Sequence, residues 1–183
     1  MSFSIKHKDP NSNARSGTIT TKSGLIDTPV FLPVCTTGAP KALSIDSLDS
    51  LEFNSIIVNA YHLFLRPGHK SIKHFGGLHS FLNWKGNIVT DSGGFQIFSL
   101  SSSAKIEDEG VTFKSFIDGS NHLITPELSI DIQESLGSDI MMILDDCPKS
   151  DSEYDLMTKS INRTRNWALR CKESKKSENQ LFG

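Results

Sequence analysis

Four short apolar runs rich in β-branched residues constrain the fold of this chain more than any other feature of its sequence. They occupy residues 30–34, 55–59, 87–90 and 139–144. Runs of this length and composition are typical of strands that are buried on both faces of a parallel sheet. Helix-start signals lie between them, and strands that alternate with helices imply right-handed βαβ crossovers. The sequence therefore predicts an α/β fold with four parallel strands.

Several segments carry the signals of helices. Ser44 precedes one amphipathic stretch, Pro67 opens another, and Thr125-Pro126-Glu127 combines an N-cap, a first-turn proline and a first-turn acid. The last helix has apolar or small residues spaced by three and four positions, which predicts one stripe against a core. The stripe consists of Tyr154, Met157, Ile161, Thr164, Ala168 and Cys171.

Two antiparallel elements are also predicted. Residues 1–26 hold β-prone pieces at 2–6 and 17–21 and form an N-terminal antiparallel β segment. A hairpin is expected from segments 111–117 and 122–124, joined by Asp118-Gly119-Ser120. Ser99 and residues 101–103 indicate a flexible polar loop. Both an open doubly wound sheet and part of a (β/α)8 barrel fit residues 27–183.

Charge and hydropathy limit the partners of the chain. With 19 basic and 21 acidic residues the net charge is −2, so any RNA contact has to be local. The basic run from Lys159 to Lys176 is either the solvated face of a helix or a phosphate-binding surface. No apolar run approaches the roughly 18 residues of a membrane span, and the start lacks a signal core. We expect a cytoplasmic protein without a membrane partner.

Three cysteines, Cys35, Cys147 and Cys171, are widely spaced and form no CxxC pair. Neither a disulfide framework nor a zinc knuckle is encoded by such spacing. We therefore expect reduced thiols and no metal ligands.

Asp91 ends the third apolar run and is followed by the turn Ser92-Gly93-Gly94. Side chains at the carboxyl ends of strands line the active sites of α/β sheets and barrels, so Asp91 is a candidate catalytic or ligand carboxylate. The alternative is an aspartate that caps the turn by accepting from amides two residues on. Phe95 follows the glycines and could stack on a planar base, or it could be a core residue.

Asp145 and Asp146 follow the fourth run. The two oxygens of a carboxylate can accept from the ring N1–H and the exocyclic amine of guanine together, and adenine offers no such pair of donors. Asp145 is the candidate for this role, and Asp146 is expected to start the next segment. Because adjacent carboxylates repel, they should point in different directions. At the end of the second run, Asn59 and His62 group polar side chains, although a lone histidine is often structural.

Together these strings resemble the tRNA-guanine transglycosylases, also called queuine or queuosine-precursor tRNA-ribosyltransferases. Their order and spacing match over nearly the whole chain. The strings are TPVFLPV (28–34), NAYHLFLRPG (59–68), GGLHSFLNW (76–84), TDSGGFQIFSL (90–100), EGVTFKSFIDGSNHLITPE (109–127) and LGSDIMMILDDC (136–147).

The resemblance implies a partial (β/α)8 barrel, about the first four βα units, in residues 27–183, after the antiparallel segment. It implies a glycosyltransferase that exchanges the wobble guanine of certain tRNAs for a deazaguanine of the queuosine pathway. In such enzymes an aspartate attacks the ribose C1′ and expels guanine, and the incoming base resolves the covalent intermediate. The roles implied are proton transfer for Asp91, a base pocket from Ser92, Gly93, Gly94 and Phe95, the guanine edge for Asp145, and the ribose side for Asn59 and His62.

The departures from the family pattern set further expectations. The nucleophilic aspartate and the Cys/His zinc cluster of the family would lie beyond Gly183, so zinc is expected only in full-length relatives and the chain alone should be inactive. Cys35 and Asp146 replace a usual glycine and a frequent glutamate. Strand edges at 30–34 and 139–144 should be unpaired, which predicts marginal stability or self-association.

Two other classes of function fit less well. A non-catalytic remnant or partner subunit would bind tRNA or a full-length relative, and a homodimer is also possible. A glycoside hydrolase would use Asp91 and Asp145 as its two carboxylates, but it would need sugar-binding aromatic residues, and the chain has two Trp and two Tyr.

Overall fold

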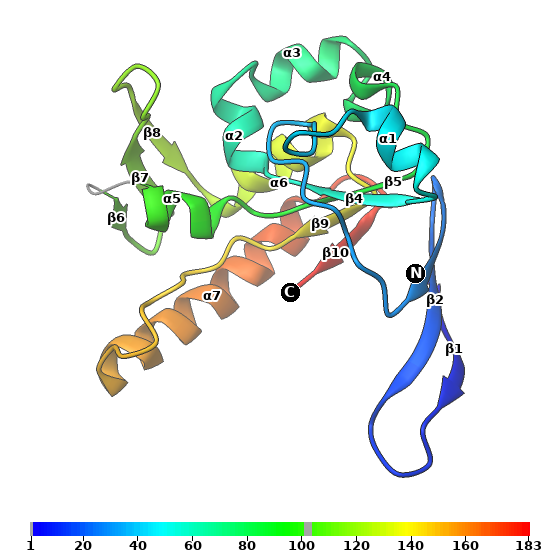
Figure 1. The fold of residues 1–183 in the computed structure, drawn as a ribbon. Coiled ribbons are helices and arrows are strands. Elements are labelled where there is room, and N and C mark those ends of the chain that lie inside the picture. The colour runs from blue at the N-terminus through cyan, green and yellow to red at the C-terminus, as the bar shows by residue number, and fades with distance from the viewer. Residues whose placement is uncertain (1, 101–103) are drawn as a thin grey trace.

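A four-stranded parallel sheet forms the centre of the molecule. The structure is a computed structural model and describes residues 2–100 and 104–183 (Figure 1). The strand order is β10-β9-β5-β4, and the strands are β4 (Ser55–Val58), β5 (Asn87–Thr90), β9 (Ile140–Met142) and β10 (Gln180–Phe182). All neighbouring pairs are parallel, which confirms the predicted α/β class with a parallel sheet.

The expected strand at 30–34 is wrong. Only Val34 pairs, as an isolated parallel bridge to Ile57, and Phe31 is 72% exposed. Pro29 precedes the run and Pro33 lies inside it, and prolines lack the amide hydrogen that a strand ladder needs. The fourth parallel strand is β10 instead. Because β10 pairs with β9, segment 139–144 is not an unpaired edge, and that expectation is also wrong.

Helices cover one face of this sheet. They are α1 (Ile45–Ser50), α2 (Ala60–Leu65), α3 (His69–His74), α4 (Leu78–Leu82), α5 (Gly94–Leu100), α6 (Pro126–Leu136) and α7 (Tyr154–Ser174). The predicted starts are confirmed for α1 and α6, where Ser44 and Thr125 accept from backbone amides and Pro126 opens α6. Ser99, which was expected in a loop, ends up inside α5, and residues 101–103 lie outside the described residues.

The stripe predicted for α7 is partly wrong. Tyr154 is 82% exposed and Ile161 is 66% exposed, whereas Trp167 and Cys171 are fully buried. The indole of Trp167 offers more apolar area than Ile161, so the helix turns the face that carries Trp167 toward the core. Trp167 Nε1 also donates to the carbonyl oxygen of Asp108 at 2.8 Å.

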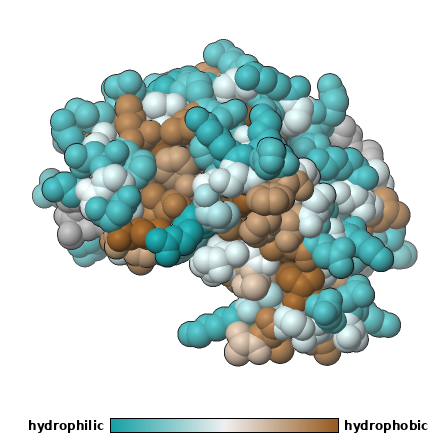
Figure 2. Space-filling model, turned by 90° about the horizontal axis from the view of Figure 1, so that it is seen from above, coloured by the Kyte–Doolittle hydropathy of each residue, from teal (hydrophilic) through white to brown (hydrophobic). Residues whose placement is uncertain are grey.

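Antiparallel sheets flank the parallel one at two places. The N-terminal sheet has the order β1-β2-β3, with β1 (Ser2–Lys8), β2 (Arg15–Thr21) and β3 (Gly24–Thr28). The second consists of β6 (Lys105–Ile106), β7 (Val111–Lys114) and β8 (Asn121–Ile124), and it confirms the predicted hairpin. On the face drawn in Figure 2, apolar side chains form separate patches divided by hydrophilic ones.

Alternate residues of the parallel strands enter two separate cores. Ile56, Val58 and Ile88 belong to the larger core beneath the helices. Their neighbours in sequence, such as Ile57 and Val89, belong to a smaller core that contains Ile26 of β3. Side chains of a strand point alternately to its two faces, so the helices pack on one face of the sheet, and β2 and β3 of the N-terminal sheet pack against part of the other.

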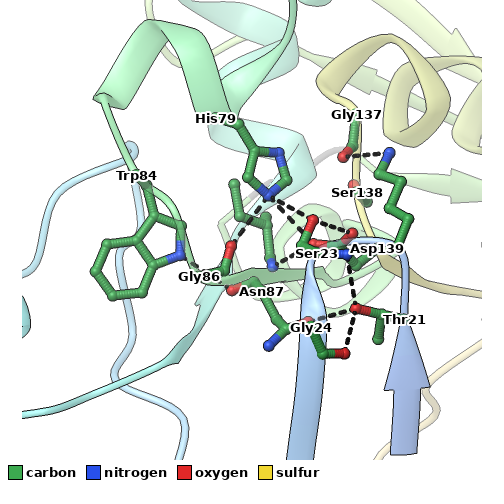
Figure 3. A network of polar contacts seen from close by, with 12 residues as sticks. Thr21, Ser23, Gly24, His79, Trp84, Gly86, Asn87, Gly137, Ser138 and Asp139 are labelled. Carbon is green, nitrogen blue, oxygen red and sulfur yellow. Dashed lines mark hydrogen bonds and ion pairs between the residues drawn. The ribbon is translucent and has the colours of Figure 1, made fainter.

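A buried polar network joins the N-terminal sheet to the amino ends of β5 and β9 (Figure 3). The carboxylate of Asp139, at 1% exposure, accepts from Ser23 Oγ at 2.6 Å and from the Ile88 amide at 2.8 Å. His79 Nε2 lies 3.2 Å from Asp139 Oδ2. Burial raises the pKa of Asp139 most strongly, but the bonds from His79, Ser23 and Ile88 together outweigh it and hold the pKa below its usual value.

Ser23, His79 and Asp139 are the residue types of a serine-nucleophile triad, but their geometry differs from one. In a triad the serine and the aspartate contact opposite nitrogens of the imidazole. Here Ser23 Oγ and Asp139 Oδ2 both face Nε2 of His79, which also lies 3.1 Å from the Gly86 carbonyl oxygen. The network therefore holds the β2–β3 turn against the sheet and has no nucleophile role.

Removing the charge of Asp139 should destabilise the fold in a pH-dependent way. The folded-state pKa is lowered, so the ionised carboxylate stabilises the protein above the unfolded pKa of about 3.9 and loses this effect as the pH falls. We expect Asp139→Asn to lower the free energy of unfolding by about 2 kcal/mol at pH 7, and by less near pH 4. Urea denaturation at both pH values measures this, with the exposed Asp151→Asn as control. An equal loss at the two pH values would contradict the assignment.

Candidate functional site

The two candidate carboxylates lie in one cleft. Asp91 directly follows β5, and Asp145 follows β9, the neighbouring strand. Since carboxyl ends of parallel strands meet at the same edge of a sheet, two distant strings of the sequence converge there. The cleft has a volume of about 440 Å³. Its lining consists of Asp91, Ser92, Phe95, Gln96, Met142, Ile143, Asp145, Thr164, Phe182 and Gly183.

Asp91 is held by donors from two helices. Its Oδ1 accepts from the Ala60 amide at 2.9 Å, and its Oδ2 accepts from Gln96 Nε2 at 3.0 Å and from Asn59 Nδ2. Burial raises the pKa of Asp91, and this effect exceeds the opposing effect of these donors and of the Gly93 amide. A carboxyl with a raised pKa can both release and accept a proton nearer to neutral pH. The turn-capping contact to Gly93 coexists with this environment.

The turn after Asp91 has to contain glycine. Gly93 has a φ of 83°, a left-handed conformation that favours glycine, and its backbone packs against Tyr61. A Cβ on Gly94 would lie 2.8 Å from the Asp145 carbonyl oxygen and 3.0 Å from Asp145 Oδ1. Ser92 Oγ accepts from the Gly94 amide at 3.2 Å and donates to Asp145 Oδ1 at 3.1 Å. The turn therefore connects the two carboxylates.

We expect Gly94→Ala to displace Asp145 and to lower the free energy of unfolding by about 1 to 3 kcal/mol, because overpacking a buried site costs about this much. The added methyl group meets backbone and carboxylate atoms, not the end of a flexible side chain. Urea denaturation measures the effect. Ser99→Ala is the control, because it changes an exposed residue of the same helix, α5. Equal free energies of unfolding for the wild type and Gly94→Ala would contradict the assigned geometry.

Asp145 and Asp146 point in different directions, as the sequence predicted. Asp145 Oδ2 accepts from Cys147 Sγ at 2.8 Å, while Asp146 Oδ2 pairs with Arg163 Nη1 of α7 at 2.6 Å. Burial, reinforced by Asp145 and Asp146, raises the pKa of Cys147 to about 12, so the thiol stays protonated and donates. Both partners of Asp145 are rotatable hydroxyl or thiol donors, which can turn aside when a ligand approaches.

Phe95 is a cleft residue and not a core residue. Its side chain is 60% exposed, so the core alternative is wrong. An exposed ring in the lining beside two carboxylates is free to stack on a planar ligand. No pattern in the sequence distinguished this position from a buried one, because it lies in a helix whose Ile97 is fully buried.

The structure separates the two polar residues of the second run. Asn59 contacts Asp91, whereas the imidazole of His62 packs against the rings of Tyr61 and Phe116, with centroids 5.3 and 5.9 Å away. His62 is not in the lining of the cleft. Sequence reasoning missed Gln96 and Cys147 as contacts of the two carboxylates. Each lies within a few residues of its aspartate, but only the turn geometry brings the side chains together.

Part of the basic run of α7 is used within the molecule. Arg170 forms two bonds to the carboxylate of Glu127, at 2.7 and 2.8 Å, and donates to the carbonyl oxygens of Asp108 and Glu109. Arg163 pairs with Asp108 and Asp146. These two arginines therefore fasten α7 to neighbouring segments. Their guanidinium groups are paired within the molecule, so they form neither a solvated face nor a phosphate-binding surface.

The cysteines do not form a metal site. Cys35 and Cys171 are buried and Cys147 contacts Asp145. Within residues 2–100 and 104–183, no group of three or more His, Cys, Asp or Glu side chains could hold a metal ion. The residues present thus do not fit a zinc centre, and no step below depends on one. Over the same residues, every helix is too short or too polar to cross a membrane.

Comparison with known proteins gives a consistent result. Residues 9–183 match the family described as Queuine tRNA-ribosyltransferase. The chain is 48% identical over 184 residues to a queuine tRNA-ribosyltransferase from Halothermothrix orenii, covering 100% of this chain and 49% of the relative. A protein of the same name from Thermodesulfovibrio yellowstonii is 52% identical over 173 residues, covering 94% of this chain and 45% of its own length.

The chain thus spans about half the length of the curated relatives that it matches. The match includes both strands that end in the cleft and every residue that lines it. The chain belongs to the queuine tRNA-ribosyltransferase family.

Proposed function

We propose that this chain carries the base-recognition half of a tRNA-guanine transglycosylase, which replaces the wobble guanine of tRNA by a deazaguanine of the queuosine pathway. The observation that carries the proposal is the convergence of Asp91, Asp145 and Phe95 on one cleft. Family membership supports the reaction class. The chain spans about half the length of its relatives. Whether it catalyses the exchange alone is therefore a question for the assay described below.

Guanine recognition is assigned to Asp145. Its two oxygens would accept from N1–H and the exocyclic amine when Ser92 and Cys147 rotate away, and charge-assisted bonds of this kind are among the stronger ones. Phe95 would stack on the ring, and Ser92, Gly93 and Gly94 would shape the pocket wall. Adenine presents one donor and one acceptor on the same edge and would leave one carboxylate oxygen unsatisfied.

Proton transfer is assigned to Asp91. In the exchange, a carboxylate oxygen bonds to the ribose C1′ while the bond from C1′ to the purine ring nitrogen breaks, and the departing guanine gains a proton. The incoming base then loses a proton, and its ring nitrogen bonds to C1′ while the bond from C1′ to the carboxylate oxygen breaks. The raised pKa of Asp91 suits a group that supplies the first proton and takes up the second. Asn59 and Gln96 hold this carboxyl in place. We assign Asn59, and His62 one turn farther along α2 and outside the cleft lining, to the ribose side.

The fold fits the first part of a (β/α)8 barrel. The parallel strands follow one another in space in chain order, from the Val34 bridge through β4, β5 and β9 to β10, and the candidate site residues follow their carboxyl ends, as barrel active sites do. A cavity of about 760 Å³ lies against β10, α7 and the β2–β3 turn. It is where the next βα unit of a barrel would pack.

The proposal is tested by incorporation of radiolabelled guanine into tRNA. The 183-residue chain is assayed alone and mixed with a separately expressed C-terminal half of the Halothermothrix orenii relative. Exchange in the mixture but not by either part supports a competent half-site. No exchange in the mixture, with both parts folded and associated, contradicts the proposal and favours a non-catalytic binding protein.

A further inference from the structure

A basic groove lies between the α2–α3 connection and the tip of the β7–β8 hairpin. It has a volume of about 410 Å³. Arg66, His69 and Lys70 line it from one side, and Ser115, Ser120 and His122 line it from the hairpin. We call this feature the basic groove.

The cations of the groove are available to a ligand. Arg66 and Lys70 are exposed, and among the described residues neither forms an ion pair with a carboxylate. By contrast, Arg163 and Arg170 form ion pairs with carboxylates of the same chain. In a chain of net charge −2, two unpaired cations beside one cavity form a local positive site.

One further feature of the wall suits an anion, and one opposes it. His69 is 7% exposed, and its Nε2 has no hydrogen-bond partner in the described part of the chain, the carboxylate of Asp131 lying 3.7 Å away. The described lining holds one carboxylate, Asp118, whose Oδ1 accepts from the amide and the hydroxyl of Ser120. Bonds from Ser120 and Ser115 lower the pKa of Asp118 to about 2, so it stays charged, and the two cations Arg66 and Lys70 share the lining with one anion.

Helix α2 and the ring of Phe116 lie between the basic groove and the base cleft, whose linings share no residue. Helix α2 begins beside Asn59, which contacts Asp91, and ends at the groove, roughly 9 Å farther along its axis. The exposed ring of Phe116 packs on His62 and Tyr61 between them, and Tyr61 also contacts Gly93 of the cleft turn. Phe116 is 59% exposed, so one face of its ring is open to a ligand.

We propose that the basic groove binds the RNA strand beside the target base, with a phosphodiester at Arg66 and Lys70 and a neighbouring base on Phe116. Cations with an interleaved exposed aromatic ring are the pattern of single-stranded nucleic-acid binding. An acidic protein would pair with Arg66 and Lys70 but would offer no base to stack on the ring of Phe116. This proposal rests on the proposed function, since it takes the target base to occupy the cleft.

The test is binding of a fluorescently labelled anticodon stem–loop RNA to the 183-residue chain at several salt concentrations. The double variant Arg66→Ala/Lys70→Ala should bind about tenfold more weakly, and its slope of log affinity against log salt should fall by about 1 to 2. Lys8→Ala/Arg15→Ala removes the same two charges from the N-terminal sheet and should bind like the wild type. Phe116→Leu should weaken binding about tenfold without changing the salt slope.

Guanine binding by each variant separates this proposal from the proposed function. Guanine affinity should be unchanged in the groove variants, and Lys70→Glu provides a second variant if the double one is poorly folded. Equal RNA affinity for the groove and control variants, or no RNA binding by a wild-type chain that binds guanine, would overturn the groove proposal alone. Failure of the wild type to bind guanine would contradict the proposed function, and the groove proposal with it.

Discussion

Asp91→Asn should reduce guanine exchange by a factor of about 10² to 10⁴ in the preparation that shows exchange. The amide has the size of the carboxyl group but cannot deliver or take up a proton. Steady-state incorporation of radiolabelled guanine measures the loss. The wild-type rate should vary with pH in the range where Asp91 titrates, above the usual aspartate range, and the residual rate of the variant should not.

A stability measurement distinguishes this chemical defect from misfolding. Because burial raises the folded-state pKa of Asp91, its ionised form is penalised in the fold. The penalty is absent below the unfolded pKa, grows as the pH rises through the folded pKa, and is constant above it. At pH 7, Asp91→Asn removes this penalty but turns an amide N–H toward one of the donors of Asn59, Ala60 or Gln96, so the two effects oppose each other and the melting temperature should stay within a few degrees of the wild type. A variant that melts at a clearly lower temperature, or one that exchanges guanine at the wild-type rate, would argue against the assignment.

Asp145→Asn should weaken guanine binding about a hundredfold and reduce the preference for guanine over adenine. The substitution replaces one acceptor by a donor, so the N1–H or the exocyclic amine of guanine loses its partner inside the cleft. Isothermal titration with guanine and adenine measures both affinities. Asp146→Asn is the matched control, because Asp146 pairs with Arg163 and not with the cleft. Equal losses in the two variants would mean that Asp145 acts only on the local structure.

The sequence predicts those parts of the fold that depend on local pattern. The helix start at Thr125-Pro126, the hairpin around Asp118-Gly119 and the strand before Asp91 follow from capping, turn and hydropathy rules, and the structure confirms them. The apolar composition of residues 30–34 predicts a strand, but Pro29 precedes the run and Pro33 lies inside it. Their missing amide hydrogens limit the pairing to Val34.

The candidate site shows the same division. The placement of Asp91 and Asp145 after neighbouring strands could be inferred, because strand ends converge in a parallel sheet. The contacts of Gln96 with Asp91 and of Cys147 with Asp145 could not, since they depend on rotamers within the turns. For His62 the sequence predicted a site residue that the structure places elsewhere. The string NAYHLFLRPG resembles the family pattern, but helix α2 points the His62 ring at Tyr61 and Phe116 and away from the cleft lining.

The convergence of Asp145 and Phe95 on a guanine is tested most directly by a crystal structure of the chain with guanine bound. Our account predicts that both Asp145 oxygens lie within hydrogen-bond distance of N1 and the exocyclic amine, with the base stacked on Phe95 and Ser92 and Cys147 turned away. A guanine bound elsewhere, or an Asp145 that keeps both of its present partners beside a bound base, would contradict it.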